Sequence, residues 1–168
     1  MKNKSINSGQ QLMLVESLSA IFGIIGITTG ILSILALKPH IWIRPLIEGE
    51  TDSFIFTSIT VLFDFLSTFF AGFAWIIGTK IVNQKIKDKI TISKKEKMAN
   101  KMDLTSFFFG LVGWILSILS LLFLFDFMKD DFASEVATII SVILDATSAS
   151  LVIAVIFILN SENKKKSI

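Results

Sequence analysis

Hydrophobic positions in this chain fall into four long runs, separated by shorter polar segments. The runs cover residues 12–37, 54–79, 104–128 and 134–160. Each exceeds the roughly 18 residues that a helix needs to cross a bilayer. The longest polar segment, 80–103, is rich in lysine and too short to bury a core of its own. We therefore predict an all-α membrane protein with four transmembrane helices in a single domain over residues 1–168.

The second and fourth runs each carry an aspartate near the middle, Asp64 and Asp145. A carboxylate at that depth costs about 2.5–3.5 kcal/mol on insertion scales, so membrane helices seldom carry one without a use for it. Hydroxyl and small residues flank both aspartates at helical spacing, which places them on one face of each helix. They are Thr57, Thr60, Ser67, Thr68 and Ala71 in the second run, and Thr138, Ser141, Ser148 and Ala149 in the fourth. The opposite side of the second run carries Phe54, Phe63, Phe70 and Phe73, which we expect to face lipid.

The two halves of the chain repeat this pattern. Seven positions of the first run match the third run at a constant offset of 87, and four positions of the second match the fourth at an offset of 81. The first set is Ser19, Phe22, Gly23, Gly26, Ile31, Leu32 and Ser33 against Ser106, Phe109, Gly110, Gly113, Ile118, Leu119 and Ser120; the second is Ile59, Val61, Asp64 and Ser67 against Ile140, Val142, Asp145 and Ser148. The pattern predicts two helical hairpins, repeat A over 12–79 and repeat B over 104–160. Both begin on the same side, so the repeat is parallel, and such repeats are usually related by an axis along the membrane normal.

Glycines in the first and third runs are candidates for close helix packing, because small residues let helix backbones approach each other in lipid. These candidates are Gly23, Gly26, Gly30, Gly110 and Gly113.

The basic residues predict the orientation. Thirteen lysines precede the first run, lie in 80–103 or follow the fourth run, whereas only Lys38, Arg44 and Lys129 lie on the other side. By the positive-inside rule, both termini and segment 80–103 face the cytoplasm. Frequent Lys, Ile and Asn suit a low-GC bacterium, so we expect a multi-pass protein of the cytoplasmic membrane in a bacterium.

Segment 80–103 is expected to be a basic cytoplasmic loop. Ile residues four apart, with lysines between them, suggest that it continues the second helix as a basic amphipathic helix on anionic lipid. The residues for contact with lipid or a cytoplasmic regulator are Lys85, Lys87, Lys89, Lys94, Lys95 and Lys97. The alternative is that these lysines only set the topology. The segment has no aromatic stacking residue, arginine or glycine-rich phosphate loop, so no sequence-specific nucleic-acid binding is expected.

The composition leaves little for covalent chemistry. The chain has no cysteine and a single histidine, His40, so disulfides, thiolate chemistry and Cys-based metal sites are excluded. The aspartates lack the Tyr-Asp and Gly-x-Gly-Asp contexts of intramembrane aspartyl proteases. We expect no enzyme, cofactor or metal. Glu16 and Asp126 lie near the ends of runs, where they are expected to reach the membrane interface.

These observations favour a homo-oligomeric channel for cations or protons, gated from the cytoplasm. Candidate residues of the ion path are Asp64, Asp145, Thr60, Ser67, Ser141 and Ser148. Two alternatives stay open: a non-catalytic interaction protein (an immunity protein, an effector's partner or an accessory subunit), and a small cation-coupled exporter. In the first of these, the hydroxyls and protonated aspartates would serve only as hydrogen bonds between helices.

Overall fold

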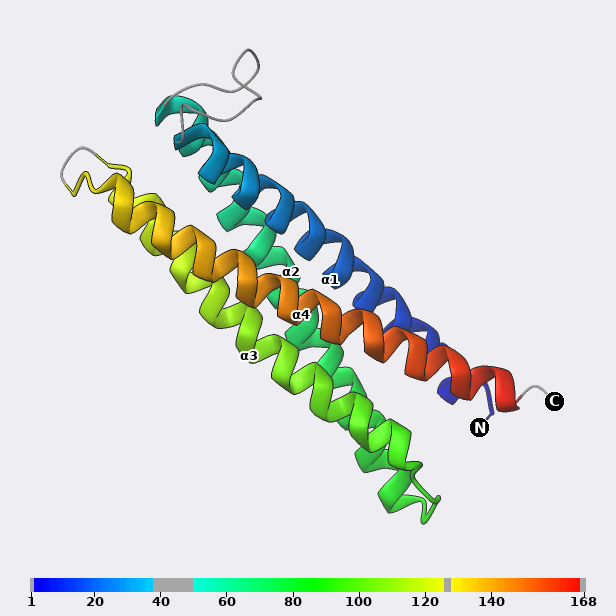
Figure 1. Ribbon diagram of the computed structural model, residues 1–168. Helices are drawn as coiled ribbons and strands as arrows, with labels where there is room; N and C mark the ends of the chain where they lie inside the picture. Colours follow the sequence, from blue (N-terminus) through cyan, green and yellow to red (C-terminus); the bar gives the residue numbers. More distant parts are fainter. Residues whose placement is uncertain (1, 38–49, 126–127, 167–168) are drawn as a thin grey trace.

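A computed structural model describes residues 2–37, 50–125 and 128–166, with side chains described over 9–37, 51–125 and 128–161. It consists of four α-helices in antiparallel succession (Figure 1). Their bounds are α1 Lys2–Leu37, α2 Glu50–Lys87, α3 Lys94–Phe123 and α4 Asp131–Lys166. All four helices are long and apolar enough to cross a membrane. The predicted all-α class and the four spanning helices are thus confirmed, and the chain is a multi-pass membrane protein. Residues 38–49, with His40, and Asp126 lie outside the described residues.

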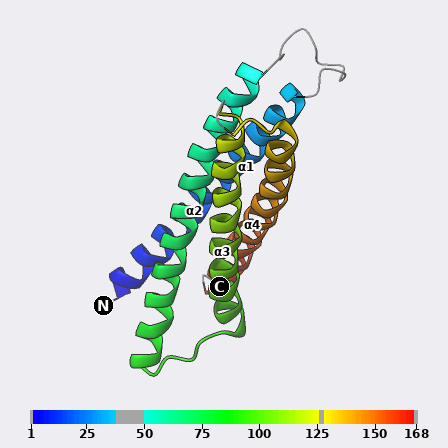
Figure 2. The same ribbon diagram turned by 90° about the vertical axis from the view of Figure 1, so that its left-hand side faces the viewer.

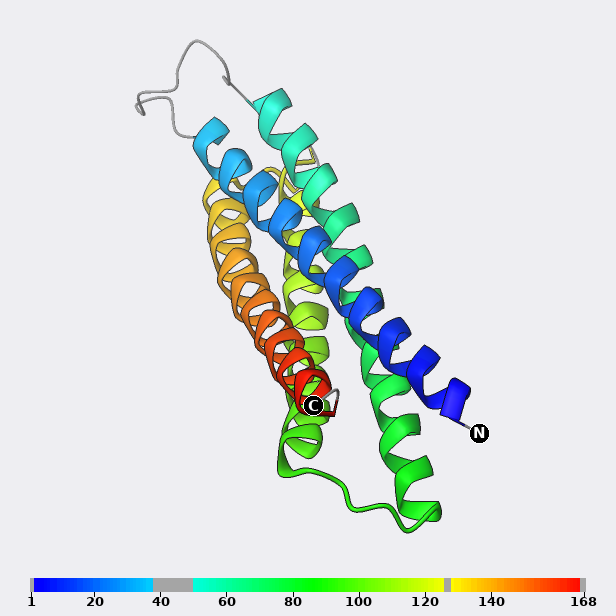
Figure 3. The ribbon, with the colours of Figure 1, turned by 90° about the vertical axis from the view of Figure 1, so that its right-hand side faces the viewer.

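The helices form an elongated bundle in which each one packs against two neighbours. α1 contacts α2 and α4, and α3 contacts the same two helices, so that α1 and α3 stand on one diagonal and α2 and α4 on the other. The start of α1, the end of α4 and the turn between α2 and α3 lie at the same end of the bundle (Figures 2 and 3). We call this the basic end, because the lysines of 85–97 surround the turn there.

The expected basic loop is mostly helical. α2 continues through Lys87 and α3 begins at Lys94, so the connection is only 88–93. Ser93 caps α3 in a capping box with Glu96, which satisfies backbone N–H groups at the start of that helix. Lys89 adopts a left-handed conformation (φ 52°) that lets the chain reverse after α2. The loop itself is therefore shorter than 80–103, and the first part of that segment continues α2, as the isoleucine spacing suggested.

At the opposite end, the connection between α3 and α4 is also tight. α3 ends at Phe123, five residues before the expected end of its hydrophobic run. The backbone N–H of Asp130 then donates to the carbonyl of Phe123 (3.0 Å), and the Asp130 side chain accepts from the N–H of Ala133 (2.9 Å). The apolar run therefore continues past the end of α3, and hydrophobicity alone placed the end of that helix too far along the chain.

The bundle has small and polar side chains inside and large apolar ones outside. Ala71, Ala74 and Val155 are among the buried apolar residues, and buried Ser, Thr, Asp and Glu residues outnumber them. Large side chains such as Phe132 and Phe157 are more than 70% exposed. A protein dissolved in water has the reverse arrangement. A lipid environment tolerates the apolar outer surface, and helices with small interior residues pack closely there.

The prediction for the phenylalanines of α2 was partly wrong. Phe73 is 48% exposed, as expected for a lipid-facing side chain. Phe63 and Phe70 instead pack against the ring of Phe22 on α1, with centroid distances of 5.8 and 5.6 Å. Phe54 packs edge-on against Phe125. These ring contacts join α2 to α1 and to the segment that follows α3.

Candidate functional site

Each aspartate is buried against a glycine of the preceding helix. Asp64 on α2 is 1% exposed and Asp145 on α4 is 5% exposed. A Cβ added to Gly26 on α1 would collide with Oδ1 of Asp64, and one added to Gly113 on α3 would collide with Oδ1 of Asp145. The two contacts are equivalent at the offsets of 87 and 81 found in the sequence. Glycine thus provides the space that each carboxyl occupies between its two helices.

Two serines connect the aspartates through hydrogen bonds. Ser117 on α3 donates to Oδ2 of Asp64 (2.5 Å), and its Oγ is also 2.6 Å from Oγ of Ser141 on α4. Ser141 in turn lies 3.0 Å from Oδ2 of Asp145 and 3.0 Å from the carbonyl of Gly113. The result is a continuous chain of polar groups, Asp64–Ser117–Ser141–Asp145, that crosses three helices. We call it the central relay.

Ser117 is the member of the central relay that the sequence did not reveal. Its counterpart at an offset of 87 is Gly30, which has no side chain. The side chain of Val142 occupies the space beside Gly30, and its Cγ2 would lie 2.7 Å from an added Cβ. Ser117 therefore departs from the repeated pattern, and a comparison of the two halves contains no signal for it. The two aspartates consequently have different surroundings.

Paired hydroxyls join the helices within each hairpin on both sides of the central relay. Ser19 and Ser67 donate to each other's backbone carbonyls (2.9 and 3.0 Å), and Ser106 and Ser148 do the same (3.1 and 2.9 Å). Toward the other end, Ser33 contacts Ser53 (3.0 Å) and Thr57 (2.6 Å), while Ser120 contacts Ser134 (2.9 Å) and Thr138 (2.6 Å). Each of these four contacts in one hairpin has its equivalent in the other at the same offsets.

The predicted path residues therefore occupy one polar axis but different levels of it. Asp64, Asp145 and Ser141 meet in the central relay. Ser67 and Ser148 lie one turn closer to the basic end, in the paired contacts described above. Thr60 lies on the other side of Asp64 and donates to Thr29 on α1 (2.9 Å). The axis is internal to one chain, between its own four helices.

The remaining candidate glycines also sit at close contacts. An added Cβ at Gly23 would lie 3.1 Å from Oγ of Ser67, and one at Gly110 would lie 2.8 Å from Oγ1 of Thr68. Thr68 is 6% exposed, and its hydroxyl has no hydrogen-bond partner among the described residues. The interior along this part of the axis is narrow and polar.

A second pair of acidic residues lies toward the basic end. Glu16 on α1 is 1% exposed and Asp103 on α3 is 2% exposed, and their carboxyls interact with each other across the bundle. The expectation that Glu16 reaches the membrane interface was wrong, because its side chain points inward between the helices. The buried position of Asp103 was not predicted, because this residue lies in the segment that was expected to be a basic loop. The two residues are themselves 87 positions apart, so the repeat contained this signal.

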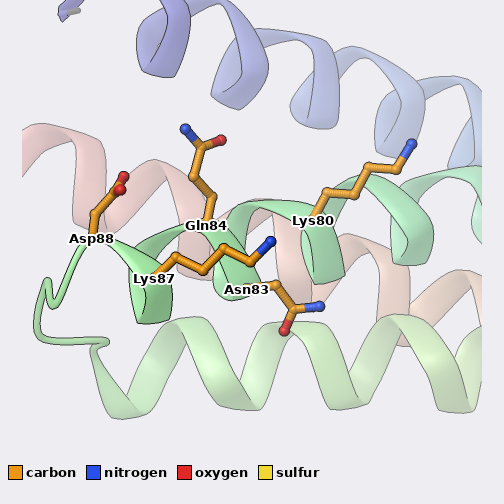
Figure 4. A pocket seen from close by; sticks show the side chains of 5 residues that line it. All are labelled: Lys80, Asn83, Gln84, Lys87 and Asp88. Carbon is orange, nitrogen blue, oxygen red and sulfur yellow. The ribbon is translucent and has the colours of Figure 1, made fainter.

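The lysines of the basic end are not equivalent. Lys85 forms an ion pair with Glu96 (2.5 Å) across the turn, and Lys95 reaches Ser161 on α4 (3.5 Å). Lys87, Lys89, Lys94 and Lys97 are exposed. Figure 4 shows a shallow depression at the end of α2, lined by Lys80, Asn83, Gln84, Lys87 and Asp88. None of the four buried acidic residues lines it.

Within the described ranges, no group of three or more His, Cys, Asp or Glu side chains is arranged to hold a metal ion. No family model matches the chain, and neither a curated protein nor a solved structure matches it.

Proposed function

We propose that this protein passes protons or small cations across the membrane along its polar axis. The observation that carries the proposal is the central relay, because it links two buried carboxyls through hydroxyls in a protein whose exterior is apolar. Intramembrane carboxyls that face a bundle interior typically belong to ion or proton pathways. Hydroxyls can both donate and accept, so a proton entering at one aspartate can leave at the other when the hydrogen bonds reverse.

The tight packing favours protons over larger hydrated ions. The carboxyls and hydroxyls of the axis lie directly against glycines of the neighbouring helices. Little space is therefore left between the side chains along the axis. A proton can move along hydrogen-bonded groups, whereas a hydrated cation needs an open route lined by oxygen atoms. On this proposal the path runs inside each chain. A homo-oligomer would assemble through the apolar outer faces and would carry one path per subunit.

We further propose that the basic end faces the cytoplasm and that both termini lie there, in the cytoplasmic membrane of a bacterium. The excess of lysine at this end supports the orientation. We expect the exposed lysines 87, 89, 94 and 97 to contact anionic headgroups or an acidic cytoplasmic regulator that gates the path. Lys85 is already paired with Glu96 and contributes less to such contacts.

The two hairpins are proposed to be copies of one ancestral unit in parallel orientation. Equivalent glycine–aspartate and hydroxyl contacts at offsets of 87 and 81 support this origin. On this view, Gly30 and Ser117 mark the point where the copies diverged. That divergence gave one aspartate a donor from the other hairpin.

A non-catalytic interaction protein is the second candidate. The reciprocal bonds between Ser19 and Ser67, and between Ser106 and Ser148, favour it, since such paired hydroxyls also stabilise static helix contacts. A small cation-coupled exporter would use the same carboxyls with an additional substrate. Flux measurements separate the interaction protein from the two conducting candidates, and dependence of the flux on a second substrate would identify an exporter.

The test is ion flux in liposomes that contain the purified protein. We expect proton or cation flux in the parent and its loss in an Asp64→Asn, Asp145→Asn double variant that remains folded. Asp131→Asn is the matched control, because Asp131 is an exposed aspartate at the start of α4. Equal flux in the parent and the double variant would remove the aspartates from the path. A folded parent without flux at any voltage or pH would favour the interaction protein.

A further inference from the structure

The carboxyls of Glu16 and Asp103 meet across one diagonal of the bundle. α1 and α3 stand on a diagonal of the bundle, and their backbones make no close contact. Asp64 and Asp145 come from the other diagonal, α2 and α4. The axis therefore carries two acidic pairs, one from each diagonal.

No side chain within the described ranges supplies a counter-charge to the second pair. Within the described residues, both carboxyl oxygens of Glu16 and Oδ1 of Asp103 are buried without a hydrogen-bond donor. Neither α2 nor α4 brings an ionisable group to the pair over the described ranges. Ala74 on α2 is fully buried in an apolar cluster with Val15, the residue next to Glu16. Gly78 leaves room for Asp103, whose Oδ2 would lie 3.6 Å from an added Cβ.

Two ionised carboxylates cannot share such a site, because like charges in contact and without a counter-ion repel strongly. A proton held between them removes one charge and supplies the missing donor. We propose that Glu16 and Asp103 form a proton-binding pair, in which Glu16 carries the proton and donates it to Asp103. Glu16 is the protonated partner because both of its oxygens are buried without a donor, whereas only one oxygen of Asp103 is in that position.

This pair has a place in the pathway, a role that rests on the proposed function. Glu16 lies ten residues before Gly26, the residue that contacts Asp64, so the two acidic pairs are about 15 Å apart along the axis. Thr68 lies between them, one turn from Asp64, and its buried hydroxyl has no partner among the described residues. The second pair is the proton-binding site on the path that would exchange protons with the basic end. Thr68 lies between this site and the central relay.

Infrared spectroscopy of the full chain, with its glutamates ¹³C-labelled at the side-chain carboxyl, tests the pair without reference to transport. We expect a protonated-glutamate band at neutral pH in the parent and its loss in Glu16→Gln. Asp103→Asn should keep the fold and the band but change its frequency and the pH at which it disappears, because the carboxylate acceptor is gone. Asp88→Asn, an exposed aspartate at the same end, should leave the band unchanged.

Absence of a protonated-glutamate band in the parent would overturn the proposal. It would also be overturned by a band that is insensitive to Asp103→Asn, since Glu16 would then hold its proton alone. A band that changes with sodium or potassium at constant pH would identify a cation between the carboxyls instead, and would likewise overturn it.

The pathway role is tested separately by flux in liposomes. If the pair lies on the proton path, Glu16→Gln and Thr68→Val should both lower proton flux relative to the parent, while Thr147→Val should leave it unchanged. Thr147 is an exposed residue whose hydroxyl bonds its own helix. Parent-level flux in Glu16→Gln and Thr68→Val overturns the pathway role. A correct infrared result with no flux in the parent leaves the pair established and removes the proposed function.

Discussion

Ser117 on α3 donates a 2.5 Å hydrogen bond to Asp64 on α2, and this bond joins the carboxyl of one hairpin to the hydroxyls of the other. Ser117 is 2% exposed, so no solvent replaces the donor if its hydroxyl is removed. The same hydrogen bond therefore stabilises the packing of the two hairpins and completes the central relay.

Ser117→Ala should lower both stability and flux. Leaving a buried acceptor without its donor costs about 1–3 kcal/mol, and the interrupted relay should reduce flux toward that of the double aspartate variant. Reversible unfolding in detergent and liposome flux provide the two readings. Ser150→Ala is the control, because Ser150 is exposed and bonds its own helix, and its effect should stay within about 0.5 kcal/mol. Parent-like flux in Ser117→Ala would show that protons do not use this link.

Gly26→Ala should destabilise the bundle although alanine is the better helix former. The added methyl collides with the Asp64 carboxyl, so the helix must shift or the carboxyl must leave its site. Gly9→Ala is the matched control: nothing lies within 4 Å of its added Cβ, and the change should stabilise by up to about 1 kcal/mol. Opposite signs in the free energy of unfolding of the two variants would support the close contact.

A double-mutant cycle then assigns the Gly26→Ala effect to the carboxyl. Asp64→Ala removes the atoms that the new methyl meets, so Gly26→Ala should be less harmful in that background. Neighbouring residues typically couple by about 0.5–3 kcal/mol. Simple additivity would mean that the methyl collides with something other than Asp64.

Accessibility labelling should place the two ends of the bundle on opposite sides of the membrane. The chain has no cysteine, so a single Thr91→Cys in the α2–α3 turn and a single Thr51→Cys at the start of α2 report cleanly. Both sites are exposed. In intact cells, an impermeant thiol reagent should label Thr51→Cys and reach Thr91→Cys only after the membrane is opened. Labelling of both in intact cells contradicts the four-span topology.

The exposed lysines of the basic end should determine its preference for anionic lipid. Replacing Lys87, Lys89, Lys94 and Lys97 with glutamine should reduce the enrichment of anionic lipid around the protein in nanodiscs of mixed neutral and anionic lipid, by about 1 kcal/mol per residue at low salt. The Lys85→Gln, Glu96→Gln double variant removes one positive and one negative charge that are paired with each other. It should have little effect on the preference for anionic lipid. A loss of the same size in both variants would rule out a role for the exposed lysines in particular.

Much of the fold could be predicted from the sequence because it depends on patterns within single helices. The lengths of the apolar runs identified four spanning helices, and the spacing of three and four placed Asp64 and its hydroxyl neighbours on one face. The ends were less accurate. The hydrophobic run after α3 continues past Phe123, and the helical signals at Ser93 and Glu96 lie inside a segment that looked like a loop.

The site was predicted less completely, since its contacts join different helices. Asp64, Asp145 and Ser141 stood out as interior candidates, but Ser117 broke the repeated pattern and was overlooked. Glu16 was interpreted as an interfacial residue because it lies near the end of a hydrophobic run. Its inward direction depends on how α1 is rotated against α2 and α4.

By itself, then, the sequence determined which residues share a helix face, because side-chain direction follows from a period of 3.6 residues. It also determined the number of spans and the equivalence of the two hairpins' contact positions. Only the tertiary structure decided which faces meet. It placed α1 and α3 on one diagonal and α2 and α4 on the other, and so brought Glu16 to Asp103 and linked Asp64 to Asp145. Such contacts span many residues in the chain, and the packing of all four helices fixes them together, so no local pattern encodes them.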